Sequence, residues 1–348
     1  MKKLGLILII LFSVNLTAQS VRPIRDHVGF CWTKSEVEKV ITYLDKDSSK
    51  YNNLSGVNLV AGISPHDDYL YAGKVYYPLF RLIKAKEVVI FGVTHGTVRR
   101  ALHDPKNVLL LDNFDYWRGP YGNVKTSPLR EAIKEKLNPE FFKTSGEAHT
   151  IEHSIEALIP FLQYYNRDVK ITPIMVTDIP FDRMDKISSQ LSRIFLSYIK
   201  KNNLKLGKDI FFLISNDADH YGKDFNNAPF GVDKKAHDKA TSMDREIAEK
   251  YIGAEINKTD LKNLTNAIWP DNEKIIPLWC GRYPIVFGLL TITKTVNGLG
   301  KKLKGKLFKY SDSRSEWVLP IKNTNLGTTA PFSYEHWCGF FSAGFYAE

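Results

Sequence analysis

Apolar segments of strand length alternate along this chain with segments of helical periodicity. Buried strands are predicted at residues 57–66, 87–95, 169–176 and 209–217. Apolar positions recur at helical spacing in residues 74–85, 155–166, 184–201 and 280–296. Ser127 before Pro128 is typical of a helix start and predicts a further helix over 128–137. Strands that alternate with helices predict a mostly parallel sheet covered by helices on both faces.

The last two predicted strands, residues 305–313 and 336–348, have no helical segment between them. They therefore predict an antiparallel edge on an otherwise parallel sheet. No repeat, low-complexity segment or Pro/Gly/Ser-rich linker divides the chain. We expect a mixed α/β fold in a single domain over residues 20–348.

The N-terminus has the layout of a secretory signal. Lys2 and Lys3 precede an apolar run to Leu16, and small and polar residues follow up to Ser20. The run is shorter than the roughly 20 apolar residues that cross a bilayer. We interpret residues 1–19 as a cleavable signal peptide and expect an exported protein, periplasmic or extracellular, without a membrane span after cleavage.

Composition and charge restrict the classes of molecule that we expect as binding partners. The 348 residues carry a formal net charge of +10, and the basic excess is spread out except for the cluster KKLKGK at 301–306. That cluster is either a polyanion site or, as we favour, a solvated turn between strands. No feature predicts a nucleic-acid partner.

Three cysteines are too few for a disulfide framework. One bridge between Cys31 and Cys338 would leave Cys280 free.

Imidazoles and carboxylates follow three of the predicted strands. The motifs SPHDDY, GVTHGT and SNDADHYG place these side chains at the strand exits: His66, Asp67, Asp68, His95, Asp217, Asp219 and His220. In open α/β sheets, ligands bind beyond the carboxyl ends of the strands. Three strands that deliver such groups to one edge predict a functional site.

The segment EAHTIEHSIE, residues 147–156, adds four titratable residues at the predicted entry to a helix: His149, Glu152, His153 and Glu156. A helix N-terminus favours a bound anion. Glu152 and Glu156 either belong to the site or complement the helix dipole, whereas His153 favours a functional role.

Cys280 directly precedes a helical run. A thiol at a helix N-terminus has a lowered pKa, and a thiolate is a soft metal ligand. The alternative is a buried, inert cysteine, which is the commoner fate of a free thiol. The other candidate metal ligands predicted at the strand ends favour a role for Cys280 in the site.

Taken in order, the motifs SPHDDYLYAG, GVTHG, HTIEHSIEALIPFLQ, SNDADHYG, CGRYPI and YSDS resemble those of the Memo family, whose prokaryotic members are often named AmmeMemoRadiSam system protein B. The resemblance implies a fold similar to the class III extradiol dioxygenases, with His66, His95 and Cys280 at the metal positions. It also implies that Asp217 and His220 line the same pocket and that His153 belongs to it. Family members have been associated with iron or copper and with redox chemistry, and an animal member with phosphotyrosine-peptide binding. We therefore expect iron or copper, with zinc as a further candidate, and no nucleotide cofactor.

The chain departs from the family where PHDDY replaces the usual PHAGY. Asp67 and Asp68 would either add oxygen ligands, which favour harder metals, or select a cationic substrate. Together with Glu156 and Arg282 they are our candidates for binding a small-molecule or peptide substrate.

Three functions remain open from the sequence. The first is a metal-dependent, dioxygenase-like redox enzyme in which His220 or His153 shuttles protons, with Asp217 beside them. The second is a non-catalytic protein that binds a peptide, an anion or a metal in the same pocket. The third is a hydrolase with Cys280 as nucleophile and His220 as base.

Overall fold

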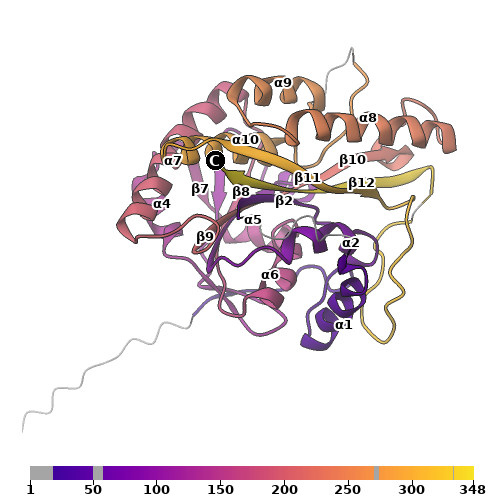
Figure 1. The fold of residues 1–348 in the computed structure, drawn as a ribbon, viewed down its shortest axis with the longest axis horizontal. Coiled ribbons are helices and arrows are strands. Elements are labelled where there is room, and N and C mark those ends of the chain that lie inside the picture. Colours follow the sequence, from indigo (N-terminus) through magenta and orange to yellow (C-terminus); the bar gives the residue numbers. More distant parts are fainter. Residues whose placement is uncertain (1–18, 50–57, 270–273, 332) are drawn as a thin grey trace, which may run out of the picture.

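The computed structural model describes residues 19–49, 58–269, 274–331 and 333–348, which form one large mixed β-sheet with flanking helices (Figure 1). The predicted signal peptide falls almost entirely outside the described residues. The strands are β1 (Val21–Arg22), β2 (Leu59–Ser64), β3 (Glu87–Val93), β4 (Leu109–Leu111), β5 (Tyr116–Trp117), β6 (Val124–Thr126), β7 (Phe142–Thr144), β8 (Lys170–Val176), β9 (Ile210–Ser215), β10 (Asp217–Gly222), β11 (Leu303–Asp312) and β12 (His336–Ala347). The α-helices are α1 (Lys34–Asp45), α2 (Tyr69–Phe80), α3 (Gly96–Ala101), α4 (Leu129–Lys136), α5 (Gly146–Ile151), α6 (Ile159–Tyr165), α7 (Phe181–Lys201), α8 (Lys234–Ile252), α9 (Lys258–Ile268) and α10 (Arg282–Asn297).

The middle of the sheet is parallel. Its main path runs β1-β5-β6-β8-β3-β9-β2-β12-β10, and neighbouring strands from β6 to β2 pair in parallel. Strand β12 is antiparallel to β2, β10 and β11, so it joins the parallel part to an antiparallel margin. The prediction of a mostly parallel sheet with antiparallel late strands is therefore confirmed, although β12 itself lies inside the sheet.

Successive side chains of the central strands point to opposite faces of the sheet, and this alternation produces two hydrophobic cores. In β3, Val89 and Phe91 belong to one core, while Val88 and Ile90 belong to the other. The first core is closed by α4, α7, α9 and α10, and the second by α1, α2 and α6. Figure 1 shows these two groups of helices on opposite faces of the sheet. The prediction of an α/β domain with helices on both faces is confirmed.

Several predicted boundaries are wrong, and three of these errors concern segments that adjoin the candidate site. Helix α2 begins at Tyr69 instead of residue 74, because the backbone of Asp68 already starts the helix and accepts from the N–H of Ala72 at 2.9 Å. The predicted helix over 155–166 is divided into a 3-10 turn, Glu156–Leu158, and α6, whose first turn holds Pro160. Strand β9 ends at Ser215, and the following residues form a new strand, β10, along β12.

The cysteines are free thiols. Cys31 and Cys338 are both buried and unpaired with each other, so the suggested bridge between them is wrong. None of the helices among the described residues is both long and apolar enough to cross a membrane.

Candidate metal centre

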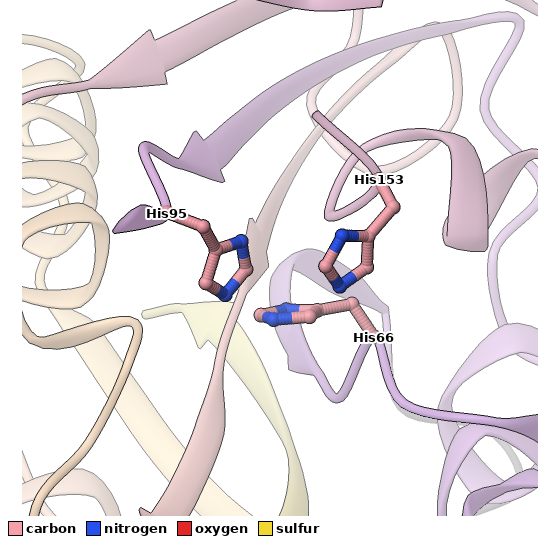
Figure 2. A group of neighbouring side chains, drawn as sticks. All are labelled: His66, His95 and His153. Carbon is pink, nitrogen blue, oxygen red and sulfur yellow. The ribbon is translucent and has the colours of Figure 1, made fainter. Parts of the chain in front are cut away.

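The carboxyl ends of three neighbouring parallel strands bring the predicted residues together. His66 follows β2, His95 follows β3 and Asp217 follows β9. The ring centroids of His66 and His95 are 5.1 Å apart. The ring of His153, from the loop after α5, stacks on His95 with centroids 4.8 Å apart and planes 5° apart. Figure 2 shows the three imidazoles converging on a common space.

Two groups of side chains are close enough to hold a metal ion, and they share His66. One consists of His66, His95 and His153, and the other of His66, Asp217 and Cys280; within each, the ligand atoms lie within 4.8 Å of one another. Nε2 of His66 is 3.4 Å from Sγ of Cys280 and 3.2 Å from Oδ2 of Asp217. His66 therefore lies next to both His95 and Cys280, which belong to different groups, and the metal triad His66, His95 and Cys280 stays a prediction.

A hydrogen-bond chain fixes the tautomer of His66. The hydroxyl of Ser215 donates to the carbonyl of Ser154 at 2.7 Å, so its lone pair is free to accept from Nδ1 of His66 at 2.8 Å. Nε2 of His66 then carries a lone pair directed at Cys280. This orientation is the one that a metal-binding imidazole needs.

Glu152 orients His95 in the same way. Its carboxylate accepts from Nδ1 of His95 at 2.7 Å and from the backbone N–H of His95 at 3.0 Å. It also accepts the backbone N–H groups of His153 and Ser154, each at 2.9 Å. The interpretation of Glu152 as a residue that complements a helix N-terminus is wrong, because it lies at the C-terminal end of α5. A carboxylate behind an imidazole is the usual support of a metal ligand.

Burial keeps most of these groups uncharged at neutral pH. It lowers the pKa of His66 and reduces the pKa of His153 and of His220 to about 4. Burial also disfavours the charged form of His95, but the negative charge of Glu152 outweighs it and raises the pKa of that imidazole. Burial raises the pKa of Asp217 to about 7.

The thiol of Cys280 differs from our prediction. Burial, reinforced by the charge of Asp217, raises its pKa well above the ordinary value, so without a cation it is a protonated thiol. Helix α10 begins only at Arg282. Gly281 separates the two and lies against Asn216, whose Oδ1 would be 2.3 Å from a Cβ added at residue 281. The glycine thus allows the cysteine to approach the end of β9 closely.

The donors fit a transition-metal ion. Imidazoles, a thiol and a carboxylate lie in two groups that share His66, and this mixture of nitrogen, sulfur and oxygen donors suits iron, copper or zinc. A bound cation would also deprotonate the thiol, because its charge reverses the effect of burial.

Two cavities reach the candidate centre. The wide cavity, about 730 Å³, is lined by His66, His95, His153, Asp217 and His220, together with residues of the segment 25–30. The narrow cavity, about 240 Å³, is lined by His95, His220, Cys280 and Arg282, among others. Both include Phe225, whose ring lies edge-on to His220 with centroids 5.0 Å apart.

The four residues predicted to bind substrate lie in different surroundings. Asp67 lines the wide cavity and Arg282 the narrow one. Asp68 is 2% exposed, and its carboxylate accepts from the hydroxyls of Tyr71 at 2.9 Å and Thr329 at 3.1 Å. Asp68 also lines the wide cavity, so its role in substrate binding stays a prediction, and its hydrogen bonds in addition tie α2 to a late loop.

Glu156 also has a structural role. It is fully buried in an ion pair with Arg22 and accepts from the backbone N–H groups of Arg25 at 3.0 Å and Asp26 at 2.7 Å. The predicted role in substrate binding is wrong for this residue. His149 stays apart from the centre as well, with its ring against Trp117 at 5.7 Å between centroids.

Sequence reasoning missed the residues that support and cover the centre. Ser215 belongs to the SND motif, and its place beside Asp217 was the available signal. The segment 25–30 and Thr329 line the wide cavity without a sequence motif that indicates it.

Comparisons with known proteins find a matching family model and several relatives. A family model described as Memo-like protein matches residues 31–318. A MEMO1 family protein of Desulfurococcus amylolyticus is 27% identical over 269 residues, which cover 75% of this chain and 79% of that protein. A MEMO1 family protein of Aquifex aeolicus is 32% identical over 195 residues, which cover 52% of this chain and 65% of that protein.

Proposed function

The chain belongs to the Memo-like protein family, and from that premise we propose that it is a metal-dependent redox protein, dioxygenase-like in its chemistry, whose ion is held by His66, His95 and Cys280. The observation that carries the proposal is the shared position of His66. Its Nε2 atom is directed by Ser215 toward Cys280, and its ring lies edge-on to that of His95. Iron or copper bound there would supply one-electron redox chemistry and open coordination positions for small molecules.

The chain's own residues would move protons and position the substrate. Nδ1 of His220 lies 3.1 Å from the carbonyl of Ala218, so it donates to that carbonyl and Nε2 is left with a lone pair. Because burial keeps this imidazole neutral, Nε2 can accept a proton from a bound molecule. His220 lines both cavities, which places it beside a substrate in either one. Asp67 lines the wide cavity, where a small-molecule or peptide ligand would enter.

The test is metal binding by substituted proteins under anaerobic conditions. We expect Cys280→Ser to lose more than about 100-fold in Fe(II) or Cu(I) affinity, because a protonated hydroxyl replaces a thiolate. Copper(I) should be affected more than Fe(II), and Cys280→Asp should partly restore Fe(II). The matched control is Cys31→Ser, which alters another buried free thiol outside both metal-capable groups. If Cys280→Ser and Cys31→Ser bind metal alike, the proposed ligand set is wrong.

Hydrolysis by a Cys280–His220 pair is less well supported. The imidazole within hydrogen-bonding distance of the thiol is that of His66, at 3.4 Å. The raised pKa of Cys280 also works against a nucleophilic thiolate. A non-catalytic binding role remains the alternative, and activity assays with catechols, thiols and peptides on metal-loaded protein distinguish it from the redox proposal.

A further inference from the structure

The narrow cavity differs from the wide cavity in its charged residues. The wide cavity contains four acidic residues, Asp26, Asp67, Asp68 and Asp217, and one arginine, Arg25. The narrow cavity contains two arginines, Arg99 and Arg282, and one carboxylate, Asp178. The two cavities have His95, His220 and Phe225 in common, so a molecule in either one would lie next to the candidate metal centre. Basic and acidic surroundings therefore adjoin the same centre.

Arg282 is a cation without an anionic partner in the described part of the chain. Its Nη1 donates to the carbonyl of Trp279 at 3.2 Å, and its Nε–H is buried without an acceptor. Its guanidinium also lies 5.1 Å from the ring centroid of Tyr283. An uncompensated donor of this kind is costly to bury, and a carboxylate or phosphate is the partner that suits a guanidinium.

The other charges of the narrow cavity are already engaged. Nε of Arg99 is 2.9 Å from Oδ1 of Asp104. Burial raises the pKa of Tyr283, the hydrogen bond with Asp178 adds to the rise, and the charge of and hydrogen bond with Arg282 oppose it. Asp178 is thus engaged by a neutral hydroxyl, which also faces Arg282. Arg282 is thus the group in this cavity that is left to receive an anion.

The start of helix α10 adds a favourable field. This helix runs from Arg282 to Asn297, has no acidic residue in its first turn and no capping side chain at Gly281. The positive end of its dipole therefore lies at the wall of the narrow cavity and reinforces the charge of Arg282.

We propose that the narrow cavity is an oxyanion subsite in which Arg282 receives the carboxylate or phosphate group of a small substrate or co-substrate. The inference rests on the proposed function only in so far as the bound anion would be held beside a metal ion. It places the anionic end of the molecule in the narrow cavity and leaves the wide cavity for a neutral or cationic portion.

The experiment measures the binding of acetate and of inorganic phosphate by calorimetry, first to metal-free and then to metal-loaded protein. The variants are Arg282→Gln and Arg282→Lys. The matched control is Arg314→Gln, because Arg314 is also half-buried and lies over a tyrosine ring, Tyr334, at 4.5 Å, but lines neither cavity. Metal content and the thermal unfolding midpoint are measured for every protein before binding is compared.

We expect the metal-free wild type to bind at least one of the two anions and Arg282→Gln to weaken that binding about 10- to 100-fold. Arg282→Lys should fall between them, since it keeps the charge but loses the planar fork. Arg314→Gln should match the wild type. Preference for acetate or phosphate identifies which oxyanion the subsite takes.

Two results would overturn the subsite. One is an absence of anion binding to both metal-free and metal-loaded wild type. The other is binding that requires the metal and is unchanged in Arg282→Gln, because the anion would then be a metal ligand. Failure of the proposed function is a separate result, seen when the wild type binds no iron or copper while the metal-free protein still binds the anion through Arg282.

Discussion

Glu156 provides the sharpest test of how the N-terminal segment that lines the wide cavity is held beside the candidate metal centre. Its buried carboxylate pairs with Arg22 and accepts two backbone N–H groups of the segment that continues into the wall of the wide cavity. The substitution Glu156→Gln keeps the size of the side chain and removes its charge. It therefore asks how much of the stability of this segment depends on the ion pair.

The magnitude follows from the burial of both partners. Glu156 is 0% exposed and Arg22 is 1% exposed. Burial lowers the pKa of Arg22 only to about 9, so the guanidinium remains charged at pH 7 and would be left without its partner. Removing one member of a buried pair usually costs about 3–5 kcal/mol. Arg22 keeps its bonds to the carbonyls of His149 at 2.9 Å and Glu152 at 2.6 Å, so we expect the lower end, about 3 kcal/mol.

The assay is urea unfolding followed by tryptophan fluorescence. Trp117 lies 4.8 Å from the guanidinium of Arg22 and reports on this region. The matched control is Glu131→Gln, because the side chain of Glu131 is 61% exposed and pairs with Arg130 at 2.7 Å. The control should lose less than about 1 kcal/mol. Equal, small losses in the two variants would refute the reasoning that Glu156 anchors the N-terminal segment.

Three further predictions concern the centre and the N-terminus. Glu152→Gln should lower Fe(II) affinity about 10- to 100-fold in anaerobic titrations, because it removes the carboxylate that orients His95, and unchanged affinity would contradict this role. Burial and the charge of Asp244 raise the pKa of Asp219 to about 8. The folded protein therefore keeps a proton on this carboxyl that the unfolded chain loses above about pH 4. The free energy of unfolding should fall as the pH rises from about 4 to about 8. The side chain of Asp219→Asn is neutral at every pH. In urea unfolding of metal-free protein from pH 5 to 8, the free energy of unfolding of this variant should fall less steeply than that of the wild type, by up to about 1.4 kcal/mol per pH unit. Identical slopes in the two proteins would count against the raised pKa of Asp219. N-terminal sequencing of exported protein should find a mature chain that begins near residues 19–21, whereas soluble cytoplasmic protein that retains Met1 would exclude export.

The fold was readable from the sequence because its periodicity is strong where burial is complete. Strands such as β3 and β9 are buried on both faces and appear as short apolar runs. The amphipathic helix α7 was likewise predicted nearly to its bounds. Strand β10 was not predicted, because DADHYG has polar residues at positions that the sheet nevertheless buries. Its pairing with β12 decides its structure, and that partner lies more than 100 residues further along the chain.

The candidate ligands were also readable, but their supporting partners were not. His66, His95 and Asp217 follow strands, and the rule for parallel sheets brings strand ends together. The sequence left the roles of Glu152 and Glu156 open, because both lie in one short segment and their side chains point to different partners. Glu152 accepts from the imidazole of His95, whereas Glu156 is paired with Arg22. Such a difference depends on the path of the backbone after α5, which periodicity does not determine.

Several residues that line the wide cavity lie outside the part of the chain that matches the family model. The family model matches residues 31–318, yet the wide cavity is also lined by Arg25, His27, Thr329 and His336 from outside that match. Two of them are held in place by residues within the match, since Glu156 accepts from the backbone N–H of Arg25 and Asp68 from that of Thr329. By the resemblance of the motifs, Asp68 is one of the two acids that stand where the family usually has small residues. Its hydrogen bonds give a physical reason for the replacement: this acid secures a late loop over the cavity, so the change bears on the shape of the entrance and leaves the imidazole and thiol donors as they are.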